Sequence, residues 1–219
     1  MKKVSSLLVT LVVMVATGAA GYGQNLLLNP SIESGSSTTQ IDDWTAHSGD
    51  TYRETVGAYG FTTAAMHDGS YGLKEFGGDG DLFQANISVQ SGVTYTASGW
   101  FYHSSTQDAI AVDASSTRMF IHIEWFDSSN NSLRNDYSAN HNGTSPADSW
   151  NLISLEVAAP VGADHATFHI ETDANVGGGS VFGDDFAFQA VPEPSSFVLV
   201  AGALAGLGLM QRTKRTTGV

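Results

Sequence analysis

The central part of the chain alternates apolar and polar residues with a period of two, and clusters of Gly, Ser, Thr and Asn interrupt it. A period of two is typical of half-buried β-strands, and the interruptions are typical of turns. Strands are predicted near Leu26–Leu28, Tyr52–Val56, Tyr71–Glu75, Leu82–Val89, Thr94–His103, Arg118–Phe126, Leu152–Val157, Ala166–Thr172 and Val181–Phe188. Loops are predicted at residues 77–80, 127–131, 139–148 and 176–179. Because helix signals are scarce here, we expect an all-β fold, an antiparallel β-sandwich.

The alternation also assigns side chains to opposite faces of each strand. In the strand from residue 94, one face holds Tyr95, Ala97, Gly99 and Phe101, and the other holds Thr96, Ser98, Trp100 and Tyr102. In the strand from residue 118, one face holds Met119, Ile121, Ile123 and Trp125, and the other holds Phe120, His122, Glu124 and Phe126. Later strands supply two further inward sets: Ile153, Leu155 and Val157, then Ala166, Phe168 and Ile170.

The first 23 residues differ from the centre and have the three parts of a secretory signal peptide. Lys2 and Lys3 are followed by an apolar run to about Ala20, which ends in small residues. We therefore expect an N-terminal signal helix in residues 1–23 and an exported protein. Two cleavage positions remain open, after Ala20 or after Gly23.

Residues 191–219 also have three parts: a Val-Pro-Glu-Pro motif at 191–194, an apolar segment at 195–210 and a basic tail at 211–219. The apolar segment has 16 residues, fewer than the roughly 20 that span a bilayer comfortably, so we expect a short transmembrane helix. The basic tail would stay in the cytoplasm. This order resembles the PEP-CTERM sorting signal. The resemblance implies that an exosortase-like membrane protease cuts near Pro192, Glu193 and Pro194, whereas an ordinary single-span anchor would keep the same topology uncut.

Between these ends, residues 24–190 form one predicted domain that is strongly acidic. It holds 21 acidic residues against four basic ones, a net charge of −17. Such a charge disfavours nucleic acid and anionic lipid, since phosphate groups are bound by Lys and Arg. The chain has no Cys, which excludes thiol chemistry and cysteine-type zinc sites.

A series of short landmarks occurs in order along this domain: Asn25–Gly35, Trp44, Gly69–Leu73, Ser91–Trp100, Trp150, Ala159–Ala163 and Gly183–Phe188. Together they resemble the jelly-roll carbohydrate-binding modules that accompany xylanases and glucanases. The resemblance implies a jelly-roll β-sandwich. It also implies a structural Ca²⁺ ion, because in those modules the opening Glu meets a closing Asp around calcium. The matching residues are Glu33, Asp184 and Asp185, with a backbone carbonyl near Ser70. Carboxylate and carbonyl oxygens are suitable calcium ligands; surface carboxylates beside turns are the alternative.

The outward sets also predict a glycan-binding surface, because sugars offer both apolar C–H faces and hydroxyl groups. Trp100 and Tyr102 would supply flat rings, and His122 and Glu124 would supply polar groups if their two strands share one sheet. Tyr52 and Tyr137 would flank them. The alternative is that these aromatic residues pack under a loop or partner.

Signals for catalysis are weak. Glu75, Glu124, Glu156 and Glu171 offer carboxylates for a glycosidase pair, but no hydrolase, zinc-protease or phosphate-loop motif occurs. We therefore expect a non-enzymatic protein at the cell surface or in the extracellular polysaccharide matrix, which it reaches after transient anchoring in the inner membrane. Its domain would bind glycan. A structural matrix protein without a specific ligand is the alternative, and a small glycoside-active enzyme comes third.

Overall fold

The computed structural model describes residues 23–47, 50–57, 66–76, 78–112, 117–173 and 178–192. The ten strands belong to one compact unit, Tyr22–Val191. The predicted signal helix and the apolar segment at 195–210 lie outside the described residues, as do Glu193 and Pro194 of the sorting motif. Within the described ranges, no helix is long and apolar enough to cross a membrane.

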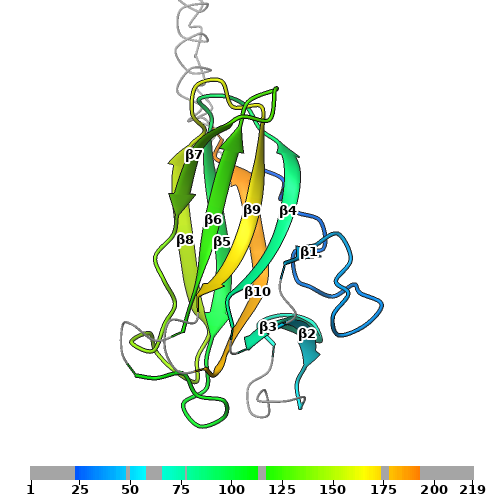
Figure 1. Cartoon of the computed structure of the whole chain (residues 1–219), viewed down its shortest axis with the longest axis vertical. Helices are drawn as coiled ribbons and strands as arrows, with labels where there is room; N and C mark the ends of the chain where they lie inside the picture. The colour runs from blue at the N-terminus through cyan, green and yellow to red at the C-terminus, as the bar shows by residue number, and fades with distance from the viewer. Residues whose placement is uncertain are drawn as a thin grey trace, which may run out of the picture. The chain divides into compact units, whose positions relative to one another are not determined.

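Two five-stranded antiparallel sheets form the unit. In chain order the strands are β1 (Thr45–Ala46), β2 (Thr51–Thr55), β3 (Tyr71–Phe76), β4 (Gly80–Ser88), β5 (Thr94–Tyr102), β6 (Arg118–Phe126), β7 (Ser132–Tyr137), β8 (Asn151–Ala158), β9 (His165–Asp173) and β10 (Ser180–Ala190). The first sheet has the order β1-β4-β9-β6-β7 and the second β2-β3-β10-β5-β8. Figure 1 shows β4, β9, β6 and β7 in front of β5, β8 and β10. The predicted antiparallel β-sandwich is confirmed.

The core lies between the sheets and is filled by the inward sets that the alternation predicts. Met119, Ile121, Ile123 and Trp125 are fully buried on β6, and Phe101 is fully buried on β5. Phe168 on β9 meets Phe186 and Phe188 on β10, with ring centroids 6.4 and 6.1 Å apart. Close packing of large rings from both layers supplies the main stabilisation of such a sandwich.

An irregularity in β10, the central strand of the second sheet, positions the predicted calcium ligands Asp184 and Asp185. The pairing with β5 shifts between Asp184 and Ala187, and Asp185 has a φ of 48°, as expected for a bulge. The bulge turns Phe186 into the core, where its N–H donates to the carbonyl of Pro30 at 3.0 Å. It leaves the Asp184 and Asp185 carboxylates next to the segment around Glu33.

The structure corrects two details of the strand prediction. Residues 26–28 form no strand, although the N–H of Leu26 donates to the carbonyl of Phe188 at 2.8 Å. Two strands that the alternation did not reveal, β1 and β7, form the two edges of the first sheet. β1 has only two residues. The residues of β7 are exposed or half-buried on both faces, so that strand carries no apolar alternation to detect.

Candidate functional site

A row of five rings crosses the outer face of the first sheet. We call His47, Phe83, His169, His122 and Tyr137 the ring row. Three of its steps follow the strand register, which pairs Phe83 with His169, His169 with His122, and His122 with Tyr137. The centroid separations along the row are 4.8, 5.4, 4.7 and 4.5 Å. Cross-strand neighbours on one face of a sheet meet at about this spacing.

The rings of the row are stacked face to face toward the Tyr137 end, whereas the His47–Phe83 and Phe83–His169 pairs are tilted by 57° and 31°. His122 is nearly parallel to both His169 and Tyr137, with interplanar angles of 17°. Tyr137 ends the row on the edge strand β7 and is 54% exposed. Its ring is therefore the broad aromatic surface that this face offers to a ligand.

Carboxylate and amide groups hold the histidines of the ring row. Asp81 lies 3.0 Å from Nδ1 of His169 and 3.4 Å from Nδ1 of His47. Glu171 Oε1 lies 2.5 Å from Nδ1 of His122, and the Nε2 of the same ring lies 3.0 Å from Oδ1 of Asn135. Asp81 and Glu171 each lie two residues from a row member on their own strand, so the alternation places them on the same face.

These contacts set the charge of His122. Burial lowers the pKa of its imidazole, but the hydrogen bonds to Glu171 and Asn135, together with the charges of Glu171 and Glu124, outweigh burial and raise the pKa above its usual value. The His122 ring therefore holds its proton more firmly than a free histidine does.

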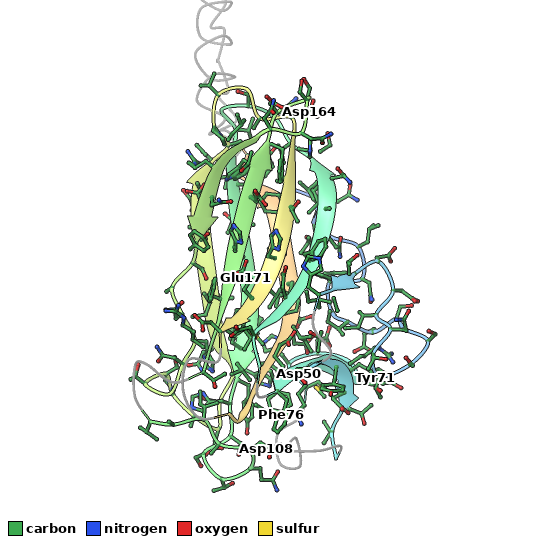
Figure 2. The ribbon with its side chains drawn as sticks, viewed as in Figure 1. Asp50, Tyr71, Phe76, Asp108, Asp164 and Glu171 are labelled. Atoms are coloured by element: carbon green, nitrogen blue, oxygen red, sulfur yellow. The ribbon has the colours of Figure 1, made fainter. Side chains whose placement is uncertain are left out.

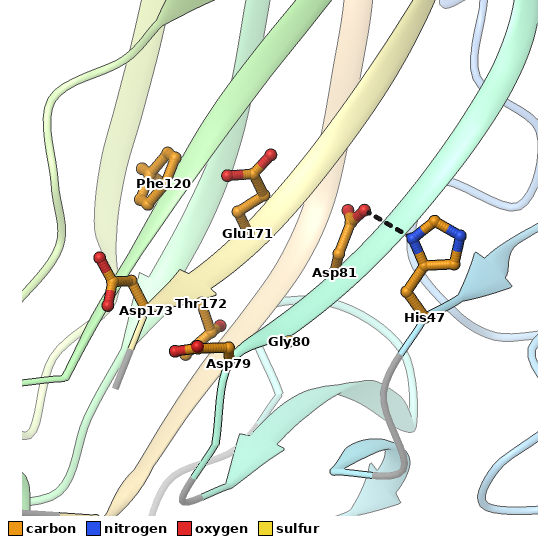
Figure 3. A pocket seen from close by; sticks show the side chains of 8 residues that line it. All are labelled: His47, Asp79, Gly80, Asp81, Phe120, Glu171, Thr172 and Asp173. Atoms are coloured by element: carbon orange, nitrogen blue, oxygen red, sulfur yellow. Dashed lines mark ion pairs between the residues drawn. The ribbon is translucent and has the colours of Figure 1, made fainter. Parts of the chain in front are cut away.

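A pocket of about 320 Å³ opens beside the ring row (Figure 3). Its wall is acidic and includes one apolar ring; the lining residues are His47, Asp79, Gly80, Asp81, Phe120, Glu171, Thr172 and Asp173. Asp173 is paired with Arg118 at 2.6 Å. Figure 2 shows Glu171 on the front sheet, and its side chain lines this pocket. Hydroxyl-rich ligands suit such a wall, because carboxylates accept hydrogen bonds from hydroxyl groups.

The structure separates the residues predicted to form one glycan cleft. His122 and Glu124 lie on β6 in the first sheet, whereas Trp100 and Tyr102 lie on β5 in the second. Tyr52 lies on β2, and the register through Lys74 and Phe182 places it on the same outer face as Tyr102. The five residues therefore divide between two opposite outer faces. Alternation predicts on which side of its strand a residue lies, but not which sheet the strand joins.

On the second sheet the predicted aromatic residues pack against other side chains, with Tyr102 buried and Trp100 half-buried. Tyr102 is only 3% exposed and groups with Met66, Phe182 and Trp150. Trp100 stacks on His67, with centroids 4.1 Å apart and planes 17° apart. We call Met66, His67, Trp100, Tyr102, Trp150 and Phe182 the covered cluster. Met66 and His67 contact these rings from a segment outside the strands, so the protein's own chain covers part of this face.

The predicted calcium ligands gather around the turn at residues 67–71. Glu33 Oε1 accepts hydrogen bonds from the N–H groups of Ser70 and Tyr71 at 2.8 and 2.9 Å. Asp184 Oδ2 accepts from the N–H of Asp68 at 3.1 Å. The N–H of Ser70 thus contacts the set.

Asp184 and Asp185 differ in surroundings. Burial raises the pKa of the Asp184 carboxyl to about 7, and the nearby charges of Asp185 and Glu33 add to the effect. Asp185 lies 2.6 Å from the Ser31 hydroxyl and 2.5 Å from Nδ1 of His67. A cation would relieve the repulsion among these carboxylates, and their hard oxygens fit Ca²⁺.

A different set of side chains is gathered more tightly. Among the described residues, one group of three His, Asp or Glu side chains could hold a metal ion: His122, His169 and Glu171. Their possible ligand atoms all lie within 4.8 Å of one another. Neutral imidazole and carboxylate are suitable ligands for transition-metal ions.

The carboxylates considered for catalysis do not form one site. Glu124 and Glu171 lie on the outer face of the first sheet, while Glu75 and Glu156 lie on β3 and β8 of the second, with β10 and β5 between them. Glu75 is fully buried. Burial raises the pKa of its carboxyl to about 8, although the hydroxyl of Thr51 donates to it at 2.8 Å.

The sequence analysis missed five residues at the outer face of the first sheet: His47, Asp81, Phe83, Asn135 and His169. Asp81 and Phe83 alternate with the buried Leu82, so the period of two was sufficient to place them outward. Their meeting with His169 depends on the pairing of β4 with β9, for which the sequence offers no local signal.

No family model and no curated protein matches the chain, but solved structures share its fold. A family 16 carbohydrate-binding module is similar over 75% of this chain and 99% of its own, with a TM-score of 0.51 and 16% identity. The CBM22-1 xylan-binding domain of Xyn10C from Paenibacillus barcinonensis is similar over 80% of this chain and 100% of its own, with a TM-score of 0.50 and 18% identity.

One neighbour is an enzyme domain. The enzymatically active domain of tailspike protein 4 of bacteriophage CBA120 is similar over 76% of this chain, with a TM-score of 0.50 and 15% identity, and the chain spans 21% of its length. At these identities the comparisons show the fold alone. The fold is the jelly-roll sandwich of carbohydrate-binding modules, as the sequence landmarks predicted.

Proposed function

We propose that the protein binds carbohydrate without cleaving it, and that the glycan lies on the outer face of the first sheet, against Tyr137 and the neighbouring carboxylates. One observation carries this proposal. On that face an exposed aromatic ring, Tyr137, stands beside acceptors for hydroxyl groups on β6, β7 and β9: Glu124, Asn135 and Glu171. Sugars have apolar faces and polar edges, so a ring bordered by carboxylates matches both.

The similarity to solved binding modules supports the proposal at the level of the fold. The family 22 module among them is a xylan-binding domain by its name.

The experiment is a glycan array probed with the purified protein. Selective binding to a class of polysaccharide is expected, with no release of sugar from the bound glycan over hours. Sugar release would overturn the non-catalytic part of the proposal. Binding to none of the glycans would overturn the proposal that the protein binds carbohydrate. The remaining hypothesis would be a structural matrix protein without a specific ligand.

Calcium is proposed as a structural ion held by Glu33, Asp184 and Asp185. An ion that binds only the folded state stabilises by about 2.7 kcal/mol at a hundred times its dissociation constant. We therefore expect a chelator to lower the melting temperature and added Ca²⁺ to restore it, with no such response in Glu33→Gln. A melting temperature that neither the chelator nor added Ca²⁺ changes would contradict the assignment.

Export and processing are proposed from the two ends. The protein would cross the inner membrane by its signal peptide, be anchored transiently through residues 195–210, and be released at the cell surface or into the matrix by an exosortase-like protease. Mass spectrometry of protein recovered from the producing cells tests this. The expected chain starts at residue 21 or 24 and ends near residues 191–194; an intact tail would contradict cleavage.

A further inference from the structure

Two histidines and a glutamate meet on the first sheet across a single strand pair. β6 and β9 are neighbours, and the register places His122 directly opposite His169. Glu171 follows His169 by two residues, so it lies on the same face of β9. The ligand atoms of the three side chains all lie within 4.8 Å of one another, close enough that small side-chain rotations would bring all three onto one ion.

The His169 ring is oriented by a carboxylate and leaves one nitrogen without a partner. Its Nδ1 lies 3.0 Å from Asp81 Oδ1. Its Nε2 is buried and makes no hydrogen bond to any residue that the structure describes. A buried polar atom without a partner costs free energy. A carboxylate behind one nitrogen with the other left free is the arrangement that orients metal-binding histidines, because it fixes the tautomer and raises the basicity of the ligand.

His122 is held in a complementary way. Its Nε2 lies 3.0 Å from Oδ1 of Asn135, an oxygen that accepts an N–H. Its Nδ1 points to Glu171 Oε1 at 2.5 Å, so a proton is shared between these two atoms. A cation that replaces this proton would be bound by both. The two imidazole rings now lie nearly parallel, 4.7 Å apart, so they turn about their Cβ–Cγ bonds when both coordinate the same ion.

We propose that His122, His169 and Glu171 bind one divalent transition-metal ion of the Zn²⁺ type, with Asp81 and Asn135 as the groups that orient the two histidines. Two imidazole nitrogens and one carboxylate oxygen suit Zn²⁺ and disfavour Ca²⁺, which takes oxygen ligands. Three protein ligands leave one position of a four-coordinate Zn²⁺ ion for a further ligand. The site shares Glu171 and Asn135 with the proposed glycan surface, but zinc binding does not require a glycan. Its ligands are separate from those proposed for calcium.

Zinc titration by calorimetry tests the proposal, using full-length protein first freed of metal with a chelator and assayed without glycan. One Zn²⁺ per chain is expected, and excess Ca²⁺ should not displace it. Glu171→Gln keeps the size of the side chain but removes its charge, and it should weaken Zn²⁺ binding about a hundredfold or more. Asp81→Asn acts through His169 and should weaken it about ten- to a hundredfold, as is usual for such partners.

His165→Gln is the matched control, because His165 lies on the same strand and stacks on Phe126 on the same face, outside the set. It should bind Zn²⁺ like the wild type. His169→Gln is a second ligand variant, and circular dichroism checks that it folds. If it does not fold, Glu171→Gln remains decisive, because 28% of the Glu171 side chain is exposed and its replacement disturbs the packing less. Absence of Zn²⁺ binding in the wild type, or equal affinity in Glu171→Gln and His165→Gln, would overturn the proposal.

Discussion

Both outer faces of the sandwich carry aromatic side chains, but they use them differently. On the second sheet, Tyr102 is 3% exposed beneath Met66 and Trp150. On the first sheet, Tyr137 is 54% exposed at the end of the ring row. An outward-facing aromatic residue is therefore not in itself a binding residue. Whether a loop covers it decides between packing and recognition, and the strand pattern contains no information about that loop.

The largest expected effect comes from the two tyrosines compared directly. Tyr102→Ala would leave a cavity among Met66, Phe182 and Trp150, and it should lower the free energy of unfolding by about 3–5 kcal/mol, as for other large buried aromatic residues. Tyr137→Ala removes an exposed ring and should cost less than about 1 kcal/mol. Urea denaturation measures both. Equal losses would show that the two faces do not differ as described.

A second prediction concerns Glu75, which is buried between the sheets, in contrast with Glu171 on the open face. The pKa of the Glu75 carboxyl is raised to about 8 in the folded protein from a usual value of 4.5. Between those pH values the folded state holds a proton that the unfolded state has lost, so stability falls as pH rises from about 4.5 to about 8 and is level above.

Glu75→Gln abolishes this dependence. The variant should gain stability relative to the wild type as pH rises, by on the order of 3 kcal/mol at pH 8, with little difference at pH 4.5. Thermal melting of both proteins across this pH range provides the measurement. Glu156→Gln, at an exposed position of edge strand β8, is the surface control and should lack this gain; a gain of similar size there would show that burial of Glu75 is not the cause.

Much of the fold followed from the sequence, because a period of two is a local signal. The inward sets on β5, β6 and β9 are the core of the structure. The edge strand β7 escaped detection because its residues face water on both sides. Residues 26–28, although apolar, run beside β10 without joining its ladder.

The site was less accessible from sequence, because it depends on strand pairing. His122 and Glu124 were placed outward correctly, but their neighbours proved to be His169, Asn135 and Tyr137, not Trp100 and Tyr102. The ring row needs four strands in a particular order, β4-β9-β6-β7, and pairing between distant strands leaves no mark in any one of them.

The central claim is that the glycan binds on the outer face of the first sheet, against Tyr137. The glycan that binds best on the array is the ligand for the most direct test. Its affinity would be measured by calorimetry for the wild type, Tyr137→Ala and Trp100→Ala, each checked for folding. The account predicts a loss of about tenfold or more in Tyr137→Ala, the scale of one aromatic contact, and an unchanged affinity in Trp100→Ala. Loss of binding in Trp100→Ala, with wild-type affinity in Tyr137→Ala, would contradict the account and place the site on the covered cluster.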